Sequence, residues 1–421
     1  MKRLNFLVAP MVGALTLGIV ACGGDGGNDA GGSDGPTEIT YWLWEDDATD
    51  PTWENLSEEF NTSQEEVEVT LQTIPLDQYQ DRLTTAVSSG SGPDAARSKD
   101  WWLGQLAPQG VLAELDPFIE DWDASEDVME PLWATGQLPG SDETYMLPHQ
   151  YVTLYLYYRK DYFDEAGLSA PETQEDVVQA AKLITDQNEG RYGIDLRGGA
   201  GGQDQWLAWM YAGGARVVDE AGEVVLDDSV AEEANERYLS IATEYDAAPP
   251  GTATAAFAQV QTNFSSGTTG MMIHHAGSLD AMREAHGENL GVVPMPTGPS
   301  GEASTLGSMS GNVVLSDSDK QEAAWKWISW LSTTDAMETM STSPQGQLPV
   351  LDSVAELEEF TSDEAVQISL EASQTARTWP AIPGVAQLAA TTWQTSLQPA
   401  MADEKPGADA LNEMASLLRE E

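Results

Sequence analysis

The sequence predicts an α/β fold divided into two domains, and three observations carry this prediction. Short apolar runs alternate with segments in which apolar residues recur at helical spacing, which is typical of strands alternating with helices. The first two runs, ITYWLW (39–44) and EVTLQTI (68–74), are each followed by a helical pattern. About 380 of the 421 residues follow the N-terminal leader and tether, and a chain of this length exceeds one ordinary hydrophobic core.

Further elements follow along the chain in the same alternation. A helix is expected over residues 50–61, and a second one has Tyr79 and Leu83 on its apolar face and ends at Gly90. Thr173 and Asp176 form a capping-box pattern at the start of a later helix. The remaining segments are the strands TLYLYY (153–158), YGIDLR (192–197), MMIHH (271–275) and NVVLS (312–316), and a helix within 318–331.

The N-terminus is typical of a secreted lipoprotein. Lys2 and Arg3 precede an apolar run that Pro10 interrupts, which favours a signal peptide over a membrane-spanning helix. The run ends in Ile19-Val20-Ala21-Cys22, which resembles the bacterial lipobox. We therefore expect residues 1–22 to be the lipoprotein signal peptide, Cys22 to be lipidated at the outer face of the cell membrane, and the Gly- and Asp-rich residues 23–37 to be a flexible tether.

Charge and cysteine content exclude several classes of protein. The formal net charge is -52, and so acidic a chain lacks the Lys and Arg on which nucleic-acid affinity rests. Cys22 is the sole cysteine, so the mature chain has neither a disulfide nor a thiolate metal site. The carboxylates are spread along the chain, which favours adaptation to a salty, halophilic habitat; a cationic ligand or calcium is the alternative.

Several strings in fixed order resemble one family. In chain order they are ITYWLW, TIPLDQYQDRLTTAVSSGSGPD, YVTLYLYYRKDYFDEAGLSAPET, NFSSGTTGMMIHH, LGVVPMPTGPSGEASTLGSMSGNVVLS and GQLPVLDSV. From about Ile39 to the C-terminus the chain is thereby similar to the extracellular solute-binding proteins of bacterial ABC importers, in the group that binds sugars.

The resemblance implies a type II periplasmic-binding-protein-like fold, in which two α/β lobes with mixed sheets enclose a ligand cleft. By analogy the first lobe is 38–153 plus 294–332, and the second is 154–293 plus 333–421. The chain would cross between them near Thr153, Val293 and Thr334. The resemblance also implies a membrane permease as partner, no cofactor, no enzymatic activity and a monomer.

Candidate ligand contacts lie in loops that follow strands, because open α/β sheets bind ligands at the carboxyl ends of their strands. Sugar sites combine aromatic platforms with fixed donors and acceptors. The family places contacts after Pro93-Asp94 and in a C-terminal loop, and Met309 departs from its usual aromatic. The candidates are Trp44, Glu45, Asp46, Ser98, Asp100, Trp101, Asp204, Trp206, His275, Ser308, Arg377 and Trp379.

Two of these candidates have a competing interpretation. Trp206 is either a platform delivered by the glycine-rich stretch 197–206 or the first buried residue of the helix that follows. His274 and His275 are adjacent on a strand, and such neighbours point to opposite faces. No carboxylate or thiol lies at ligand spacing from them, so we expect no metal site.

The favoured function is capture of a sugar or oligosaccharide for an importer. The first alternative is a protein of the same fold that binds a charged solute, such as a polyamine or glycerol phosphate. The loops that carry the candidate ligand contacts have too few charges of one sign to favour such a solute. The second is a secreted glycosidase, which needs two placed carboxylates. The chain has too many acidic residues to single out such a pair, and the histidines lack HExxH spacing.

Overall fold

A mixed sheet of nine strands runs through the part of the chain that the computed structural model describes, namely residues 35–44, 50–343 and 347–420. The strand order along its main path is β2-β1-β3-β8-β4-β6-β5, with β7 beside β4 and β9 beside β8. The strands are β1 (Thr37–Leu43), β2 (Val67–Thr73), β3 (Ala95–Lys99), β4 (Leu147–Arg159), β5 (Tyr192–Asp195), β6 (Thr269–His275), β7 (Leu290–Val293), β8 (Thr305–Val314) and β9 (Ala376–Arg377).

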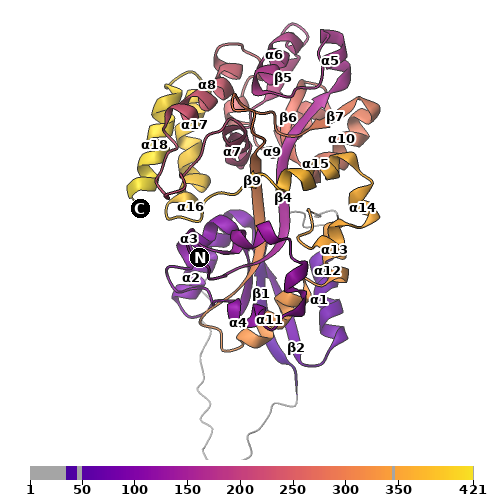
Figure 1. The fold of residues 1–421 in the computed structure, drawn as a ribbon, viewed down its shortest axis with the longest axis vertical. Helices are drawn as coiled ribbons and strands as arrows, with labels where there is room; N and C mark the ends of the chain where they lie inside the picture. Colours follow the sequence, from indigo (N-terminus) through magenta and orange to yellow (C-terminus); the bar gives the residue numbers. More distant parts are fainter. Residues whose placement is uncertain (1–34, 45–49, 344–346, 421) are drawn as a thin grey trace, which may run out of the picture. The chain divides into compact units, whose positions relative to one another are not determined.

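Helices cover this sheet (Figure 1). The α-helices are α1 (Thr52–Ser63), α2 (Leu76–Ser88), α3 (Leu103–Leu106), α4 (Asp116–Ile119), α5 (Lys160–Ala166), α6 (Gln174–Ile184), α7 (Gly202–Ala212), α8 (Ser229–Thr243), α9 (Phe257–Ser265), α10 (Leu279–His286), α11 (Gln321–Trp330), α12 (Thr334–Ser341), α13 (Asp352–Ala355), α14 (Glu358–Thr361), α15 (Glu364–Ser373), α16 (Val385–Gln387), α17 (Trp393–Met401) and α18 (Gly407–Glu420). The 3-10 turns are η1 (Asp100–Trp102), η2 (Asp123–Asp127), η3 (Glu130–Gly136), η4 (Thr252–Thr254), η5 (Ala276–Ser278) and η6 (Gly287–Asn289), and η7 (Leu388–Thr392) is a π-helix.

Local sequence signals explain several boundaries. Thr173 and Asp176 form the predicted capping box, in which the Thr173 hydroxyl accepts from the Asp176 N–H and the Asp176 carboxylate accepts from the Thr173 N–H. Gly90 follows α2 with a φ of 68°, a left-handed conformation that costs glycine little. The apolar spacing within 318–331 becomes α11, whose buried face includes Ala324, Trp327 and Ile328.

Buried apolar residues gather in four clusters that we group into two lobes. Two clusters contain residues of β1, α1 and α11 together with the residues around Val350; we call this part the first lobe. Two others contain residues of α6, α7, α17 and α18 and the second half of β4; we call this part the second lobe. Among the described residues, no helix is long and apolar enough to cross a membrane.

Strands β4 and β8 belong to both lobes. Residues 147–153 of β4 pair with β8 antiparallel, and residues 154–159 then pair with β6 and β7. In β8, Leu306 belongs to a cluster of the second lobe and Met309 to a cluster of the first. Figure 1 shows β4 as one long strand that continues from the β1–β3 sheet to β6.

Two of the predicted crossover positions differ from these contacts. Residues after Val293 remain with the second lobe, since Thr297 and the α6 segment exchange backbone hydrogen bonds and Met295 lies in its core. Residues after Thr334 remain with the first lobe, where Met337 and Met340 are buried. By these contacts the chain changes lobe within β8, a strand that continues through both lobes, and again between Phe360 and Ala365, in the connection between α14 and α15.

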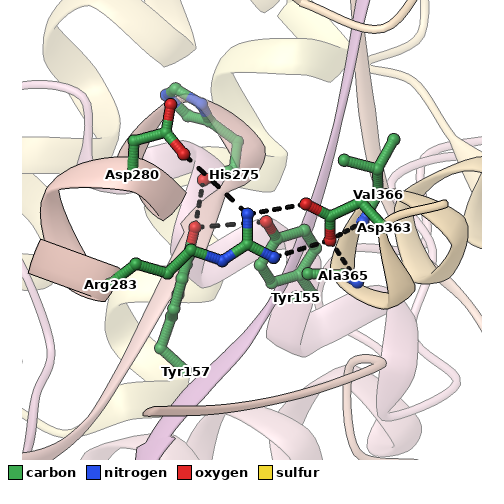
Figure 2. A network of polar contacts seen from close by, with 8 residues as sticks. All are labelled: Tyr155, Tyr157, His275, Asp280, Arg283, Asp363, Ala365 and Val366. Carbon is green, nitrogen blue, oxygen red and sulfur yellow. Dashed lines mark hydrogen bonds and ion pairs between the residues drawn. The ribbon is translucent and has the colours of Figure 1, made fainter. Parts of the chain in front are cut away.

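An ion pair fixes the chain where it enters the second lobe for the last time. Arg283 of α10 donates from both terminal nitrogens to the Asp363 carboxylate, at 2.6 Å each. The same carboxylate caps α15 by accepting from the Ala365 N–H at 3.0 Å. Beside it the Tyr155 and Tyr157 hydroxyls lie 3.1 Å apart, as Figure 2 shows. The network ties α15 to α10 and to the second half of β4.

Candidate functional site

The ends of β1 and β3 are held together by a buried arginine. The Arg97 guanidinium donates to the Trp44 carbonyl at 2.8 Å and to the Gln150 side-chain oxygen at 2.7 Å. It lies 4.2 Å above the Trp44 ring, an arrangement that favours a cation over an aromatic face. Trp44 and Arg97 are both buried. This arrangement fixes the carboxyl edge of the first-lobe sheet.

Asp100 begins the turn after β3 and is the most unusual group at this edge. Its side chain is buried. The backbone N–H groups of Trp101 and Met309 lie near its carboxylate, but neither oxygen forms a hydrogen bond of good geometry within the described part of the chain. Burial raises the pKa of Asp100 to about 7, although Lys99 and the nearby N–H groups of Trp101 and Met309 act in the opposite direction. Lys99 itself donates to the Ser310 hydroxyl at 2.8 Å. The Asp100 carboxylate therefore has unused acceptor capacity, which costs free energy when water is excluded.

The second lobe presents a carboxylate and an indole on its side of the same region. The Trp379 indole N–H donates to Asp204 at 2.9 Å. Asp204 lies in the first turn of α7, and burial raises its pKa while the Trp379 hydrogen bond, Lys99 and Arg197 lower it. Lys99 belongs to the first lobe, so its charge interacts here with a carboxylate of the second lobe. The Tyr211 hydroxyl donates to the Thr378 carbonyl at 2.9 Å and holds the loop that carries Trp379.

A cavity of about 250 Å³ lies between the two lobes at this place. Asp100 and residues 134–141 form its first-lobe wall, and Thr378–Ala381 form its second-lobe wall. Next to it the backbones of both lobes approach closely, because a Cβ added to Gly104 would lie 2.5 Å from the Ala381 carbonyl carbon. The Asp100 carboxylate and the Trp379 ring thus line a small, partly open space, which suits a ligand with hydroxyl donors and an apolar face.

Comparison with known proteins assigns the family. Residues 45–338 match the model of the bacterial extracellular solute-binding proteins. The chain belongs to this family. A binding protein of Brucella abortus is 27% identical over 347 residues, which are 82% of this chain and 83% of the relative. The erythritol/L-threitol-binding protein of Mycolicibacterium smegmatis is 24% identical over 301 residues, or 64% of this chain and 62% of that protein.

A solved structure shows the same fold. The ABC transporter solute-binding protein of Thermotoga lettingae, bound with α-D-tagatose, superposes with a TM-score of 0.78 at 23% identity. The superposition covers 91% of this chain and 99% of that one. The predicted α/β fold of the type II periplasmic binding proteins is thereby confirmed.

The solute-binding protein brings some predicted site residues together. Asp100 and Trp379 line the cavity, Asp204 accepts from the Trp379 indole behind it, and Trp101 packs against clusters of both lobes. Trp44 lies behind them under Arg97. Ser98 of β3 is buried opposite Gly311, and Ser308 of β8 pairs with Val152. Glu45 and Asp46 lie outside the described residues.

Other predicted residues lie elsewhere. Trp206 is a core residue of α7: it is fully buried, and its indole N–H donates to Asn235 at 2.9 Å. Its assignment as a platform is therefore wrong, because α7 begins before it and turns the ring inward. Arg377 lies exposed on β9, and His275 accepts from the Gly277 N–H at 3.0 Å. Neither of these two residues lines the cavity.

The histidine pair is arranged differently from the expectation. The rings of His274 and His275 lie with their centroids 4.3 Å apart, so they do not point to opposite faces. The reason is that β6 ends at His275 and the alternation of a strand stops there. His274 shares a hydrogen bond of 2.8 Å with Ser278. Within the described residues, no group of three His, Cys, Asp or Glu side chains is placed to hold a metal ion.

Several site residues escaped the sequence analysis. Residues 134–141 line the cavity but are far from any strand end in the sequence. The Tyr151 hydroxyl of β4 lies close to Gly307, since a Cβ added to Gly307 would be 1.9 Å from the hydroxyl oxygen. Gln150, the partner of Arg97, lies beside Tyr151. A glycine that faces a tyrosine across two paired strands can be recognised in the sequence only once the pairing of β4 with β8 is known.

Proposed function

We propose that this protein is the substrate-binding component of an ABC importer and that it captures a sugar or polyol between its lobes. The observation that carries the proposal is Asp100, a buried carboxylate with unused acceptor capacity at the wall of the cavity between the lobes. Hydroxyl groups of a ligand supply the missing donors, and Trp379 offers an apolar face. The ligands that name or accompany the relatives, erythritol, threitol and tagatose, have this chemistry.

The charges at the cavity favour a neutral ligand over the charged solutes considered above. Asp100 in the cavity wall and Asp204 behind Trp379 both interact with the charge of Lys99, and Asp204 also interacts with Arg197. A polyamine would need an excess of carboxylates, and a phosphate would need cations left over for it. Because the two signs are balanced, polar but uncharged groups are the best complement.

Two lobes that close over the ligand complete this proposal. The crossing segments are β4, β8 and the residues between Phe360 and Ala365, and we place the hinge there. Periplasmic binding proteins are among the proteins known to close by a hinge motion. The protein then acts as a carrier that presents the enclosed ligand to a permease, without chemistry of its own.

The leader and the surface charge extend the proposal beyond the described residues. We infer that Cys22 carries a lipid that anchors a monomer to the outer face of the membrane, and that the acidic surface suits a halophilic habitat. The lipobox pattern and the net charge of -52 support these two inferences. Labelled fatty acid should enter the wild-type protein and not a Cys22→Ala variant, and incorporation into the variant would exclude the anchor.

A thermal-shift screen tests the binding function. Polyols, monosaccharides and oligosaccharides are added in high salt, because binding to the native state raises the melting temperature by mass action. At least one neutral sugar or polyol should raise it, and Asp100→Asn should reduce the shift. Asp352→Asn is the control, since Asp352 is exposed on α13. A shift with charged solutes alone would contradict the proposal, and product formation from an oligosaccharide would reveal a glycosidase.

A further inference from the structure

Two acidic side chains from opposite lobes share the interior of the cleft. Asp100 of the first lobe is 2% exposed, and neither of its oxygens forms a hydrogen bond of good geometry in the chain as described. Asp204 of the second lobe accepts one hydrogen bond, from the Trp379 indole. The charge of Asp204 acts on Asp100 in the unfavourable direction. The arrangement of the lobes thus brings two carboxyl groups together with few hydrogen-bond donors.

The surrounding groups offset the repulsion between the Asp100 and Asp204 carboxyl groups only in part. Lys99 faces both carboxyl groups, but it also donates to Ser310. Arg197 faces Asp204 from the loop before α7. Tyr151 of β4 and Tyr211 of α7 lie near enough for the charge of Asp100 to act on them. Burial raises the pKa of both tyrosines well above the ordinary value for tyrosine, so these two phenols stay neutral whenever the carboxyl groups titrate.

Asp100 lines a cavity whose opposite wall is formed by Trp379 and the rest of the 378–381 loop of the second lobe. Parting of the two lobes would therefore admit water to its carboxylate. With the lobes apart, water reaches the carboxylate and its pKa returns toward the ordinary value for aspartate, about 3.9. In the closed form burial raises that pKa to about 7. An empty cleft that closes at neutral pH must therefore either desolvate a charge or take up a proton.

We propose that Asp100 and Asp204 keep the empty cleft open at neutral pH, and that either a proton or the hydroxyl groups of the ligand allow it to close. This inference rests on the proposed function, since the ligand is taken to be a neutral sugar or polyol. Ligand hydroxyls donate to the carboxylate and replace the water that closure removes. At neutral pH the protein thereby closes only when it carries a ligand. The permease then meets loaded protein in the closed form and empty protein in the open form.

The direction of the pH effect follows from linkage. The closed form binds a proton more tightly than the open form, so closure of the empty protein is favoured as the pH falls from about 7 toward about 4. One proton changes the closure equilibrium by up to tenfold per pH unit within this window. Between pH 7 and pH 5 the expected change is therefore up to about 100-fold. Asp100→Asn removes the charge and should favour closure at neutral pH.

Small-angle scattering of the empty, full-length protein tests the inference. The radius of gyration of the wild type should fall between pH 7.5 and pH 5, and that of Asp100→Asn should already be small at pH 7.5 and change little. Asp195→Asn is the matched control, since Asp195 is a buried carboxylate that is hydrogen-bonded to Thr252 and Asn263 within the second lobe. This control should behave as the wild type. Near-ultraviolet circular dichroism confirms that each variant is folded.

Three results would overturn the inference. They are an unchanged radius of the wild type between the two pH values, an Asp100→Asn variant as open as the wild type at pH 7.5, and an equal pH response in wild type and variant. If Asp100→Asn does not fold, the wild-type titration together with Asp204→Asn decides the question. Failure of the proposed function looks different, because then no sugar or polyol binds at either pH while the pH response of the empty protein persists.

Discussion

Trp379 and Trp206 show how one residue type serves two purposes in the same lobe. Trp379 contacts the cavity and donates to Asp204, whereas Trp206 donates to Asn235 inside the core. Both are fully buried in this closed form. Burial alone therefore does not distinguish them, and the hydrogen-bond partner does.

Replacing these two residues by alanine should give opposite results. Trp379→Ala should weaken ligand binding about tenfold or more, because a stacked ring and a donor to Asp204 are lost together. Trp206→Ala should lower the free energy of unfolding by about 3 to 5 kcal/mol and leave the affinity of the folded fraction near that of the wild type. Calorimetric titration and urea melts of both variants measure this. Equal loss of affinity in both would contradict the assignment.

His149 predicts acid sensitivity of the first lobe. It is buried in β4 with its ring 5.7 Å from Trp53, and burial together with the Arg97 charge lowers its pKa to about 3. The unfolded chain has a histidine pKa of about 6.5. The neutral His149 ring thus makes its full contribution to the free energy of unfolding above pH 6.5. This contribution is lost as the pH falls from 6.5 toward 3, by up to about 1.4 kcal/mol per pH unit.

Urea melts at pH 7 and pH 5 check this expectation. His149→Gln should lose less stability between the two pH values than the wild type, although it starts from a lower value because a buried contact is changed. His286→Gln serves as the control, since His286 is only partly buried. An identical loss in the wild type and in His149→Gln would show that other groups account for the acid sensitivity.

Asp100, Asp204 and Trp379 could be predicted as candidates because each stands in a loop or at a helix start beside a recognisable turn. Trp206 could not be placed from the sequence, because the start of α7 decides whether that ring faces the loop or the core. Residues 134–141 escaped because their place at the cavity depends on contacts between distant segments. Such contacts leave no local pattern.

Among the elements, α3 carries Gly104, at which the backbones of the two lobes approach closely. A Cβ at Gly104 would lie within 2.6 Å of three backbone atoms of Ala381 and Ile382. Backbone atoms cannot move aside as the end of a flexible side chain does. The small residue is therefore needed for closure of the lobes.

Gly104→Ala should weaken ligand binding while leaving each lobe folded. The open form has room for the methyl group, so the cost falls on closure, and we expect at least a tenfold loss of affinity. Gly193→Ala is the contrasting variant, because its Cβ would lie 2.2 Å from Ala181 within the second lobe and should lower the melting temperature instead. Wild-type affinity in Gly104→Ala, measured by calorimetry, would contradict this contact.

The cap of α15 offers a second test at this scale. Asp363→Ala removes both the N-terminal cap and the two hydrogen bonds from Arg283, so the free energy of unfolding should fall by about 1 to 2 kcal/mol. Asp280→Ala is the control, because Asp280 is fully exposed and its oxygen lies 3.8 Å from Arg283. Urea melts should show a change within about 0.5 kcal/mol for the control. A larger loss in the control than in Asp363→Ala would show that the cap is unimportant.

The order and type of the predicted strands agree with the structure because apolar runs bounded by turns are local signals. The strand predicted at 153–158 is only the second half of β4, which begins at Leu147. His149 and Gln150 are polar residues in the first half, and they obscured its apolar pattern. The predicted lobe boundaries differ from the observed contacts for another reason. Strands β4 and β8 continue through both lobes, so a boundary does not coincide with the end of a strand.

For the whole molecule, the acidic surface is the dominant property. A net charge of -52 on 421 residues destabilises the compact form through self-repulsion. Among the described residues, most ion pairs are exposed on at least one side, such as Lys326 with Glu66 and Lys405 with Glu413. Exposed pairs contribute little and do not offset the excess of carboxylates.

The melting temperature should therefore rise with sodium chloride between 10 mM and 2 M, because the screening length falls from about 30 Å to about 3 Å at molar salt. Potassium chloride should act equally, since screening does not depend on the identity of the cation. A flat profile would remove the argument for a salty habitat. A gain with millimolar calcium alone would point to a specific cation site.

The central claim is that a neutral sugar or polyol binds between the lobes at Asp100, and a crystal structure with the best compound of the thermal-shift screen tests it most directly. The ligand should lie between Asp100 and Trp379, with at least one hydroxyl within about 3.0 Å of the Asp100 carboxylate. A ligand bound outside the cleft, or bound there with no hydroxyl near Asp100, would contradict the account.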